Sequence, residues 1–185
     1  MRAPPDFPNP SRSRGFTLVE LTATVAVATI VVAIGVPSLR RAIESRHLDR
    51  AVMAMFSTLG LARSEAIKRN APVVLCKSAD GAACAAGGGW EQGWVTFHDA
   101  NNNADLDAGE TVIQKAEAVG AGVHFSGNLK VARYISFSGV GAPRTVGGAF
   151  QAGTLTACHD GQGRQVILSA TGRSRLGKAP AADCQ

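Results

Sequence analysis

The sequence predicts an α+β fold, in which a long amino-terminal helix packs on a carboxy-terminal antiparallel β-sheet. Residues 16–36 are almost wholly apolar, residues 37–70 repeat apolar side chains with a helical period, and residues 71–185 contain short segments typical of strands. The chain has 185 residues, of which 45% are hydrophobic and 18% charged. That length accommodates one globular domain with an appendage, and this composition excludes a disordered protein.

The apolar segment from Phe16 to Val36 has 21 residues, and Glu20 is its only charged residue. A helix of that length spans a hydrocarbon layer of about 30 Å. A secretory signal peptide would have a shorter apolar region and a small-residue cleavage site, whereas this segment runs on into Pro37. We therefore expect a transmembrane helix over residues 16–36. A carboxylate in such a helix costs a few kcal/mol, so Glu20 is expected to have a partner that neutralises it.

Residues 37–70 are predicted to continue the helix as an amphipathic segment. Pro37 removes one backbone hydrogen bond and bends the helix. Beyond it, apolar residues recur at spacings of three and four, which places them on one helix face: Leu48, Val52, Met55, Leu59, Ala62 and Ala66. Basic residues fall largely elsewhere, on a face that is either solvated or in contact with lipid headgroups or DNA. We expect the helix to end near Asn70, because Pro72 prevents its continuation.

Residues 71–185 are predicted to form antiparallel strands separated by clusters of Gly, Asn or Asp. The predicted strands are PVVLCK, GWVTFH, ETVIQK, GVHFSG, YISFS, TLTACH and RQVILSA. Residues 70–163 carry five basic and eight acidic residues, whereas residues 164–185 carry four basic residues and one acidic residue. The formal net charge of +5 is therefore unevenly distributed, and a site for a polyanion is expected to be local.

The residues RGFTLVEL, from Arg14 to Leu21, closely resemble the class III signal of type IV pilins and type II secretion pseudopilins. The resemblance implies a pilin-like fold and a leader peptide of residues 1–15, which a prepilin peptidase removes after Gly15. It also implies methylation of the new amino terminus, Phe16. Glu20 matches the nearly invariant glutamate of the family, which meets the amino-terminal charge of a neighbouring subunit during filament assembly.

The arrangement GWxxFxDxN…D…GE, from Gly93 to Glu110, resembles the GspH/FimT branch of the pilin superfamily. The expected partners are other pilin or pseudopilin subunits, the peptidase and, before assembly, the bacterial inner membrane. The expected location is a single pass through that membrane, with residues 71–185 as a periplasmic GspH/FimT domain. We expect no enzymatic activity, because the histidines are scattered and neither an HExxH nor a GxSxG motif is present.

The four cysteines are expected to form disulfides, because a periplasmic domain lies in an oxidising compartment. The spacing favours Cys76–Cys84, across a Gly/Ala-rich loop, and Cys158–Cys184, which would attach the carboxy-terminal tail to the sheet. The other pairings remain alternatives. A zinc site would more usually show a closely spaced CxxC-like pair, which the sequence lacks.

A polar segment between two predicted strands carries oxygen-bearing residues at positions 1, 3, 5, 7, 9 and 12 of an EF-hand-like loop, namely Asp99, Asn101, Asn103, Asp105, Asp107 and Glu110. Hard oxygen ligands at alternate positions suit a calcium ion. However, Ala104 stands where such a loop requires glycine, and the flanking segments are strands rather than helices. A polar hairpin loop without metal is therefore the preferred interpretation, calcium is the alternative, and no other cofactor is expected.

A short basic motif, Gly172-Arg173-Ser174-Arg175, follows the last predicted strand. In an extended chain, residues i and i+2 point the same way, about 7 Å apart, so Arg173 and Arg175 could each bind a separate phosphate. Gly172 permits a bend of the backbone, and Lys178 adds a third charge. Two exposed arginines are more often ordinary solvated surface, but the motif resembles the DNA-binding GRxR tail of the FimT minor pilins of natural transformation.

The resemblance thus implies a minor pilin that binds DNA without sequence preference for uptake. Two alternatives remain open. One is a structural minor pseudopilin, the H subunit of a type II secretion system, and the other is a minor pilin that only primes pilus assembly.

Overall fold

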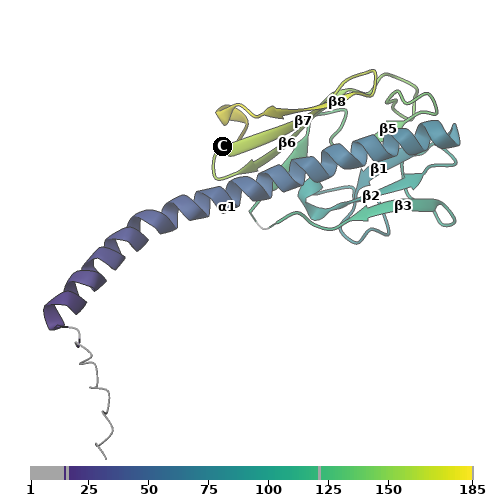
Figure 1. Cartoon of the computed structure of the whole chain (residues 1–185). Helices are drawn as coiled ribbons and strands as arrows, with labels where there is room; N and C mark the ends of the chain where they lie inside the picture. Colours follow the sequence, from purple (N-terminus) through teal and green to yellow (C-terminus); the bar gives the residue numbers. More distant parts are fainter. Residues whose placement is uncertain (1–14, 16, 121, 185) are drawn as a thin grey trace, which may run out of the picture. The chain divides into compact units, whose positions relative to one another are not determined.

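The computed structural model describes residue 15, residues 17–120 and residues 122–184, which contain one long helix, eight strands and two short 3-10 helices (Figure 1). These are α1 (Leu18–Arg69), β1 (Val73–Lys77), η1 (Trp90–Gln92), β2 (Trp94–His98), β3 (Thr111–Ala116), β4 (His124–Gly127), β5 (Tyr134–Phe137), β6 (Gly153–His159), β7 (Gln162–Leu168), β8 (Ser174–Lys178) and η2 (Ala181–Cys184). The predicted α+β fold is confirmed. Residues 1–14 and Phe16, on which the leader and methylation predictions fall, lie outside the described residues.

The chain divides into two units, residues 1–41 and residues 42–185, and α1 contributes to both. In the first unit, Leu18–Val36 is long and apolar enough to cross a membrane, and its side chains are exposed. Thr17 caps the start of α1, because its hydroxyl oxygen accepts a hydrogen bond of 3.2 Å from the backbone N–H of Glu20. The backbone stays helical through Pro37.

The end of α1 follows from the residues after it. Asn70 adopts a left-handed conformation with φ 49°, its N–H donates to the carbonyl of Ile67, and the N–H of Ala71 donates to that of Ala66. This pair of bonds is the Schellman arrangement, which satisfies carbonyls that the last turn would otherwise leave unpaired. Pro72 then excludes further helix. The predicted end near Asn70 is confirmed.

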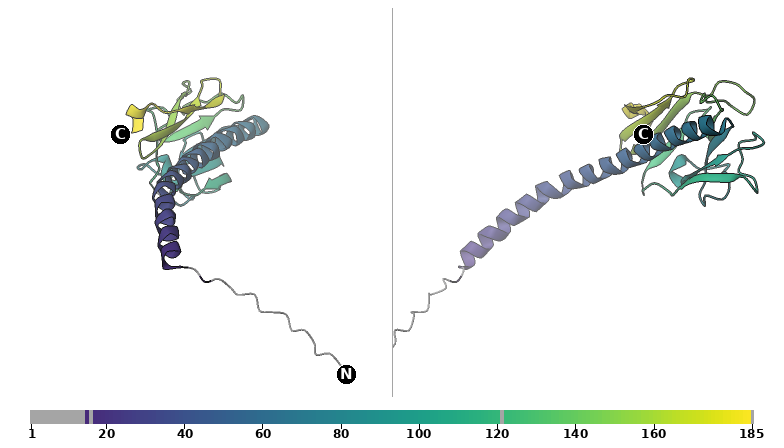
Figure 2. Two further views of the ribbon diagram at one scale, coloured as in Figure 1. Left: turned by 60° about the vertical axis from the view of Figure 1, so that its left-hand side comes forward. Right: turned by 45° about the vertical axis from the view of Figure 1, so that its right-hand side comes forward.

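In the second unit, one face of the carboxy-terminal half of α1 packs against two antiparallel four-stranded sheets, of order β3-β2-β1-β5 and β4-β6-β7-β8. Figures 1 and 2 show β1–β3 on one side of this half of the helix and β6–β8 on the other. The predicted apolar face of the helix is buried in full: Leu48, Val52, Met55, Leu59, Ala62 and Ala66. Buried residues from both sheets complete the same core, including Leu75, Trp94, Phe125 and Val166. Helix and sheets therefore share one hydrophobic core.

Both predicted disulfides are present. Cys76–Cys84 closes the loop after β1, and Cys158–Cys184 joins β6 to η2. The second bridge closes a sequence separation of 26 residues and holds the carboxy-terminal tail against the sheet, as expected. On the chain-entropy account such a loop stabilises the fold by about 3 kcal/mol.

Two features of the sheets differ from the sequence-based expectation. The strands divide into two sheets, and buried residues of both sheets pack against the single apolar face of α1. The basic tail after Gly172 is itself a strand, β8, which pairs antiparallel with β7 over Ser174–Lys178. Its sequence SRLGK lacks the run of β-branched residues that marks the other strands, so pairing with β7, rather than propensity, specifies it.

Candidate functional site

The basic motif lies in the hairpin that joins β7 to β8. The backbone N–H of Gly172 donates to the carbonyl of Ser169, and the N–H of Ser169 donates to the carbonyl of Arg173. The hydroxyl of Ser169 also accepts a hydrogen bond of 3.1 Å from the N–H of Arg173. Gly172 has φ 79°, a conformation that side-chain-bearing residues rarely adopt. The hairpin therefore fixes the direction in which the chain enters β8.

Gly172 is also packed tightly against a neighbouring loop. A β-carbon added there would lie 2.2 Å from the carbonyl oxygen of Gly141 and 3.3 Å from Pro143 Cδ. From α1, Arg63 donates a hydrogen bond of 3.2 Å from Nη1 to the carbonyl of Gly172. The Nε of Arg63 is buried and has no hydrogen-bond partner among the described residues. Arg63 thus links α1 to the hairpin through this hydrogen bond. The helical pattern of the sequence did not distinguish it from the surface arginines.

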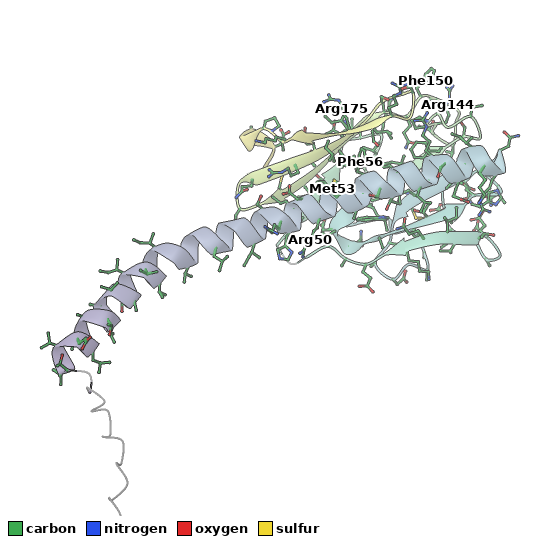
Figure 3. The ribbon with its side chains drawn as sticks, viewed as in Figure 1. Arg50, Met53, Phe56, Arg144, Phe150 and Arg175 are labelled. Carbon is green, nitrogen blue, oxygen red and sulfur yellow. A yellow bond between two sulfur atoms is a disulfide. The ribbon has the colours of Figure 1, made fainter. Side chains whose placement is uncertain are left out.

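Arg173 and Arg175 are exposed, and neither side chain has an ion pair or a hydrogen bond within the described part of the chain. Arg175 pairs across the sheet with Ile167, on the face of the sheet away from the buried core residues Val166 and Leu168. Figure 3 shows the Arg175 side chain projecting outward from β8. The two guanidinium groups are therefore free to bind a ligand.

Lys178 occupies the opposite face of β8. It pairs with Arg164, on the side where Leu176 pairs with buried Val166. There it lines a groove of about 470 Å³ between α1 and β8, whose other charged members, Arg164 and Asp49, form an ion pair of 2.8 Å. The structure thus brings Arg173 and Arg175 together in one hairpin and places Lys178 on a different surface.

Arg144 is a second basic residue next to the hairpin that was not predicted from the sequence. The guanidinium of Arg144 lies over the ring of Phe150, with 3.9 Å between Cζ and the ring centroid. Arg144 directly follows Pro143, which packs on Gly172. The signal available in the sequence was an aromatic residue in a Gly-rich loop with a basic residue six positions earlier, GAPRTVGGAF, which is too common to single out.

The polar loop from Asp99 to Glu110 is held together by its own hydrogen bonds. Buried Asp99 accepts from the backbone N–H groups of Asn103, at 3.1 Å, and Ala104, at 2.9 Å. Ala104 takes a positive φ of 62°, as the sixth position of an EF-hand-like loop would require. Glu110 accepts from the N–H groups of Ala100 and Asp107. These contacts fix the backbone of the loop and are compatible with both interpretations of it.

The remaining oxygen-bearing side chains of this loop are also engaged. Asp107 accepts from the side-chain amides of Asn101, at 2.8 Å, and Asn103, at 2.7 Å, and these two bonds hold its pKa below the ordinary value. Asp105 forms an ion pair of 2.6 Å with Arg133. Among the described residues, no group of three or more His, Cys, Asp or Glu side chains is placed to hold a metal ion. Calcium binding by this loop stays a prediction.

Replacing Asp99 by alanine tests what holds the loop. The change leaves the buried backbone N–H of Ala104 without an acceptor, while that of Asn103 keeps Asn101 Oδ1 at 3.2 Å. We therefore expect a loss of about 2 kcal/mol of stability, or roughly 6 °C in Tm. Thermal unfolding, followed by the near-UV circular dichroism of the tryptophans, measures the fall in Tm. We expect the same fall with and without millimolar calcium. A Tm of the wild type that rises with calcium, and a rise that is absent from the variant, would instead support the calcium alternative.

Comparisons with known proteins agree with this architecture. The family model described as type II transport protein GspH matches residues 51–172, and the prokaryotic N-terminal methylation motif matches residues 10–36. A search of the curated proteins gives no significant match. Among solved structures, the type IV minor pilin FimU of Pseudomonas aeruginosa superposes with a TM-score of 0.53 at 19% identity, over 75% of this chain and 92% of FimU.

The minor pseudopilin EpsH from the type 2 secretion system of Vibrio cholerae is also similar, with a TM-score of 0.49 at 12% identity, over 71% of this chain and 97% of EpsH. The methylation motif and the apolar helix Leu18–Val36 fit a membrane-anchored pilin. The GspH model covers most of the two-sheet unit and extends over the carboxy-terminal half of α1 through to Gly172. The chain therefore belongs to the GspH family of type II transport proteins and carries the prokaryotic N-terminal methylation motif, and it shares its fold with a type IV minor pilin.

Proposed function

We propose that this filament subunit binds DNA without sequence preference, through Arg173 and Arg175, for uptake in natural transformation. The observation that carries the proposal is the hairpin: both arginines are exposed, neither is paired within the described chain, and the turn that carries them is held by Gly172 and Arg63. A planar guanidinium matches the geometry of a phosphate and stays charged at any physiological pH.

The charge around the hairpin favours an anionic ligand. Residues 161–182 contain four basic and no acidic residues, and residues 118–159 contain three basic and no acidic residues. A phosphate near Arg173 would therefore meet little repulsion from neighbouring segments. Because Lys178 lies on the other face of β8, it adds to the field of this region but does not take part in the same contact.

The double substitution Arg173→Gln/Arg175→Gln tests the proposal. We expect it to weaken DNA binding by at least about tenfold at low salt, because two phosphate contacts are lost. The slope of log affinity against log salt should fall by about 0.7 per arginine for a single strand and by about 0.9 for a duplex. The measurement is a salt-titrated fluorescence anisotropy assay with the full-length protein in an uncharged detergent.

A matched control separates the site from the overall charge. The variant Arg46→Gln/Arg50→Gln removes the same two charges from exposed positions of α1, and Figure 3 shows Arg50 along the helix, away from Arg175. We expect this control to retain most of the affinity. Equal losses in the two variants, or unchanged binding by the hairpin variant, would contradict the proposed site.

The second candidate is a structural pseudopilin of type II secretion, which the description of the matching family model favours. A deletion strain distinguishes the two candidates. Reduced DNA uptake with normal protein secretion supports the DNA-binding pilin, and the reverse phenotype supports the pseudopilin. A strain that loses surface filaments altogether, and regains them with the hairpin variant, would show a role in priming pilus assembly.

A further inference from the structure

We propose that Phe150, with Arg144 stacked on one face of its ring, is a stacking site for an unpaired nucleobase, and that the preferred ligand of the hairpin is single-stranded DNA. The inference rests on the proposed function and deepens it, because it names the strand state of the DNA. Four observations carry it: the exposure of the ring, the rigidity of its backbone, the position of Arg144, and the proximity of the arginine hairpin.

Phe150 is unusual among the aromatic residues of the domain. Its exposed fraction is 57%, whereas every other phenylalanine and tryptophan in the described part of the chain is buried or half-buried. An exposed ring leaves apolar surface in contact with water, and covering that surface is favourable. A nucleobase can cover it, since every base has a flat π face.

The backbone that presents the ring is firmly anchored. Gln151, which is fully buried, accepts a hydrogen bond of 2.9 Å from the N–H of Ser136. Its amide nitrogen donates to the carbonyls of Lys130 and Tyr134, both at 2.8 Å. The ammonium of Lys130 in turn donates to the carbonyl of Phe150 at 3.2 Å. Phe150 is thus exposed at a fixed position, and little order would have to be gained on binding.

Arg144 covers one face of the ring, and the exposed fraction of 57% shows that ring surface remains open to a ligand. Its Cζ lies 3.9 Å from the ring centroid, and its Nη1 donates to the carbonyl of Gly148 at 3.3 Å. The cation–π contact orients the ring and places a permanent positive charge beside it. A base stacked on the open face would therefore bring its own phosphate close to a guanidinium.

The stacking pair is next to the hairpin. A β-carbon added at Gly172 would lie 3.3 Å from Pro143 Cδ, so the two backbones pass close to each other. The residues that follow these two are Arg173 and Arg144. Figure 3 shows Arg144, Phe150 and Arg175 along the same side of the domain. Phosphate-binding arginines beside an exposed aromatic ring are the combination that binds single strands without sequence preference. In a duplex the bases stack on one another, so the ring has no base to bind.

Affinity measurements with three ligands test the inference: a thymine oligonucleotide, an abasic strand of the same length, and a duplex. The full-length protein in uncharged detergent should bind the thymine strand several-fold more tightly than the abasic strand. For Phe150→Ala we expect about a tenfold loss on the thymine strand and little change on the other two. Phe150→Trp should retain the affinity, and because Trp90 and Trp94 are buried, quenching of the new indole by bound thymine strand reports stacking directly.

The possible outcomes distinguish failure of the stacking site from failure of DNA binding by Arg173 and Arg175. If the wild type binds thymine and abasic strands equally, or if Phe150→Ala weakens all three ligands alike, the stacking site is overturned while the arginine site stands. If Phe150→Trp binds the thymine strand without quenching, stacking is likewise excluded. If Arg173→Gln/Arg175→Gln leaves the binding of all three ligands unchanged, the proposed function itself is lost, and the inference is lost with it.

Discussion

Replacing Gly172 by alanine is expected to destabilise the two-sheet unit by about 2 to 4 kcal/mol, from two separate causes. A residue with a β-carbon pays about 1 kcal/mol to adopt the left-handed φ of 79°. The added β-carbon would also lie 2.2 Å from the carbonyl oxygen of Gly141, which is backbone and cannot rotate away. Moving two loops apart to relieve such a contact costs about 1 to 3 kcal/mol.

Thermal unfolding measures this effect, and the chain supplies its own reporter, because both of its tryptophans, Trp90 and Trp94, are buried in this unit. We expect the Tm to fall by roughly 10 °C. Gly161→Ala is the matched control, since Gly161 has a φ of 70° and open space around its α-carbon. It should cost only the backbone part. Equal losses in the two variants would show that the contact with Gly141 contributes nothing.

The features predicted correctly from the sequence depend on residues close together in the chain. The buried face of α1 follows from a helical period, its end near Asn70 from Pro72, and the two disulfides from the spacing of four cysteines. Seven strands follow from β-branched and aromatic residues between turns. The helical period, the helix end and the strands are each signalled within a short stretch of sequence. The Cys158–Cys184 bridge spans 26 residues, and its prediction also used the expected oxidising compartment.

The candidate site shows the limit of such signals. The basic motif was visible as Gly172, Arg173 and Arg175, but the contact of Gly172 with Gly141 joins two loops that are distant in the sequence. The opposite orientations of Arg175 and Lys178 depend on the register between β7 and β8. No local pattern reports such long-range packing.

Glu20 is predicted to pair with the amino terminus of a neighbouring subunit, and a second physical role, helix capping, is also possible for it. It is the only charged residue of Leu18–Val36, so an unneutralised carboxylate there would cost a few kcal/mol in a lipid or filament interior. It also stands in the first turn of α1, three residues after the capping Thr17, where a glutamate stabilises a helix terminus by about 0.3 to 1 kcal/mol. The first role requires a positive charge on a neighbouring subunit, and the second requires none.

Glu20→Gln separates these roles, because glutamine keeps the size and the capping capacity of the side chain but removes its charge. If Glu20 meets the amino terminus of a neighbour, we expect incorporation into filaments to fall by at least about tenfold, which corresponds to about 1.4 kcal/mol. Immunoblots of sheared filaments measure incorporation, and mass spectrometry of the membrane fraction should still show a mature chain that begins at Phe16. Thr17→Ala, which removes the cap and keeps the charge, should assemble normally. Normal assembly of Glu20→Gln together with a defect in Thr17→Ala would assign the glutamate to helix capping and exclude the intersubunit charge pair.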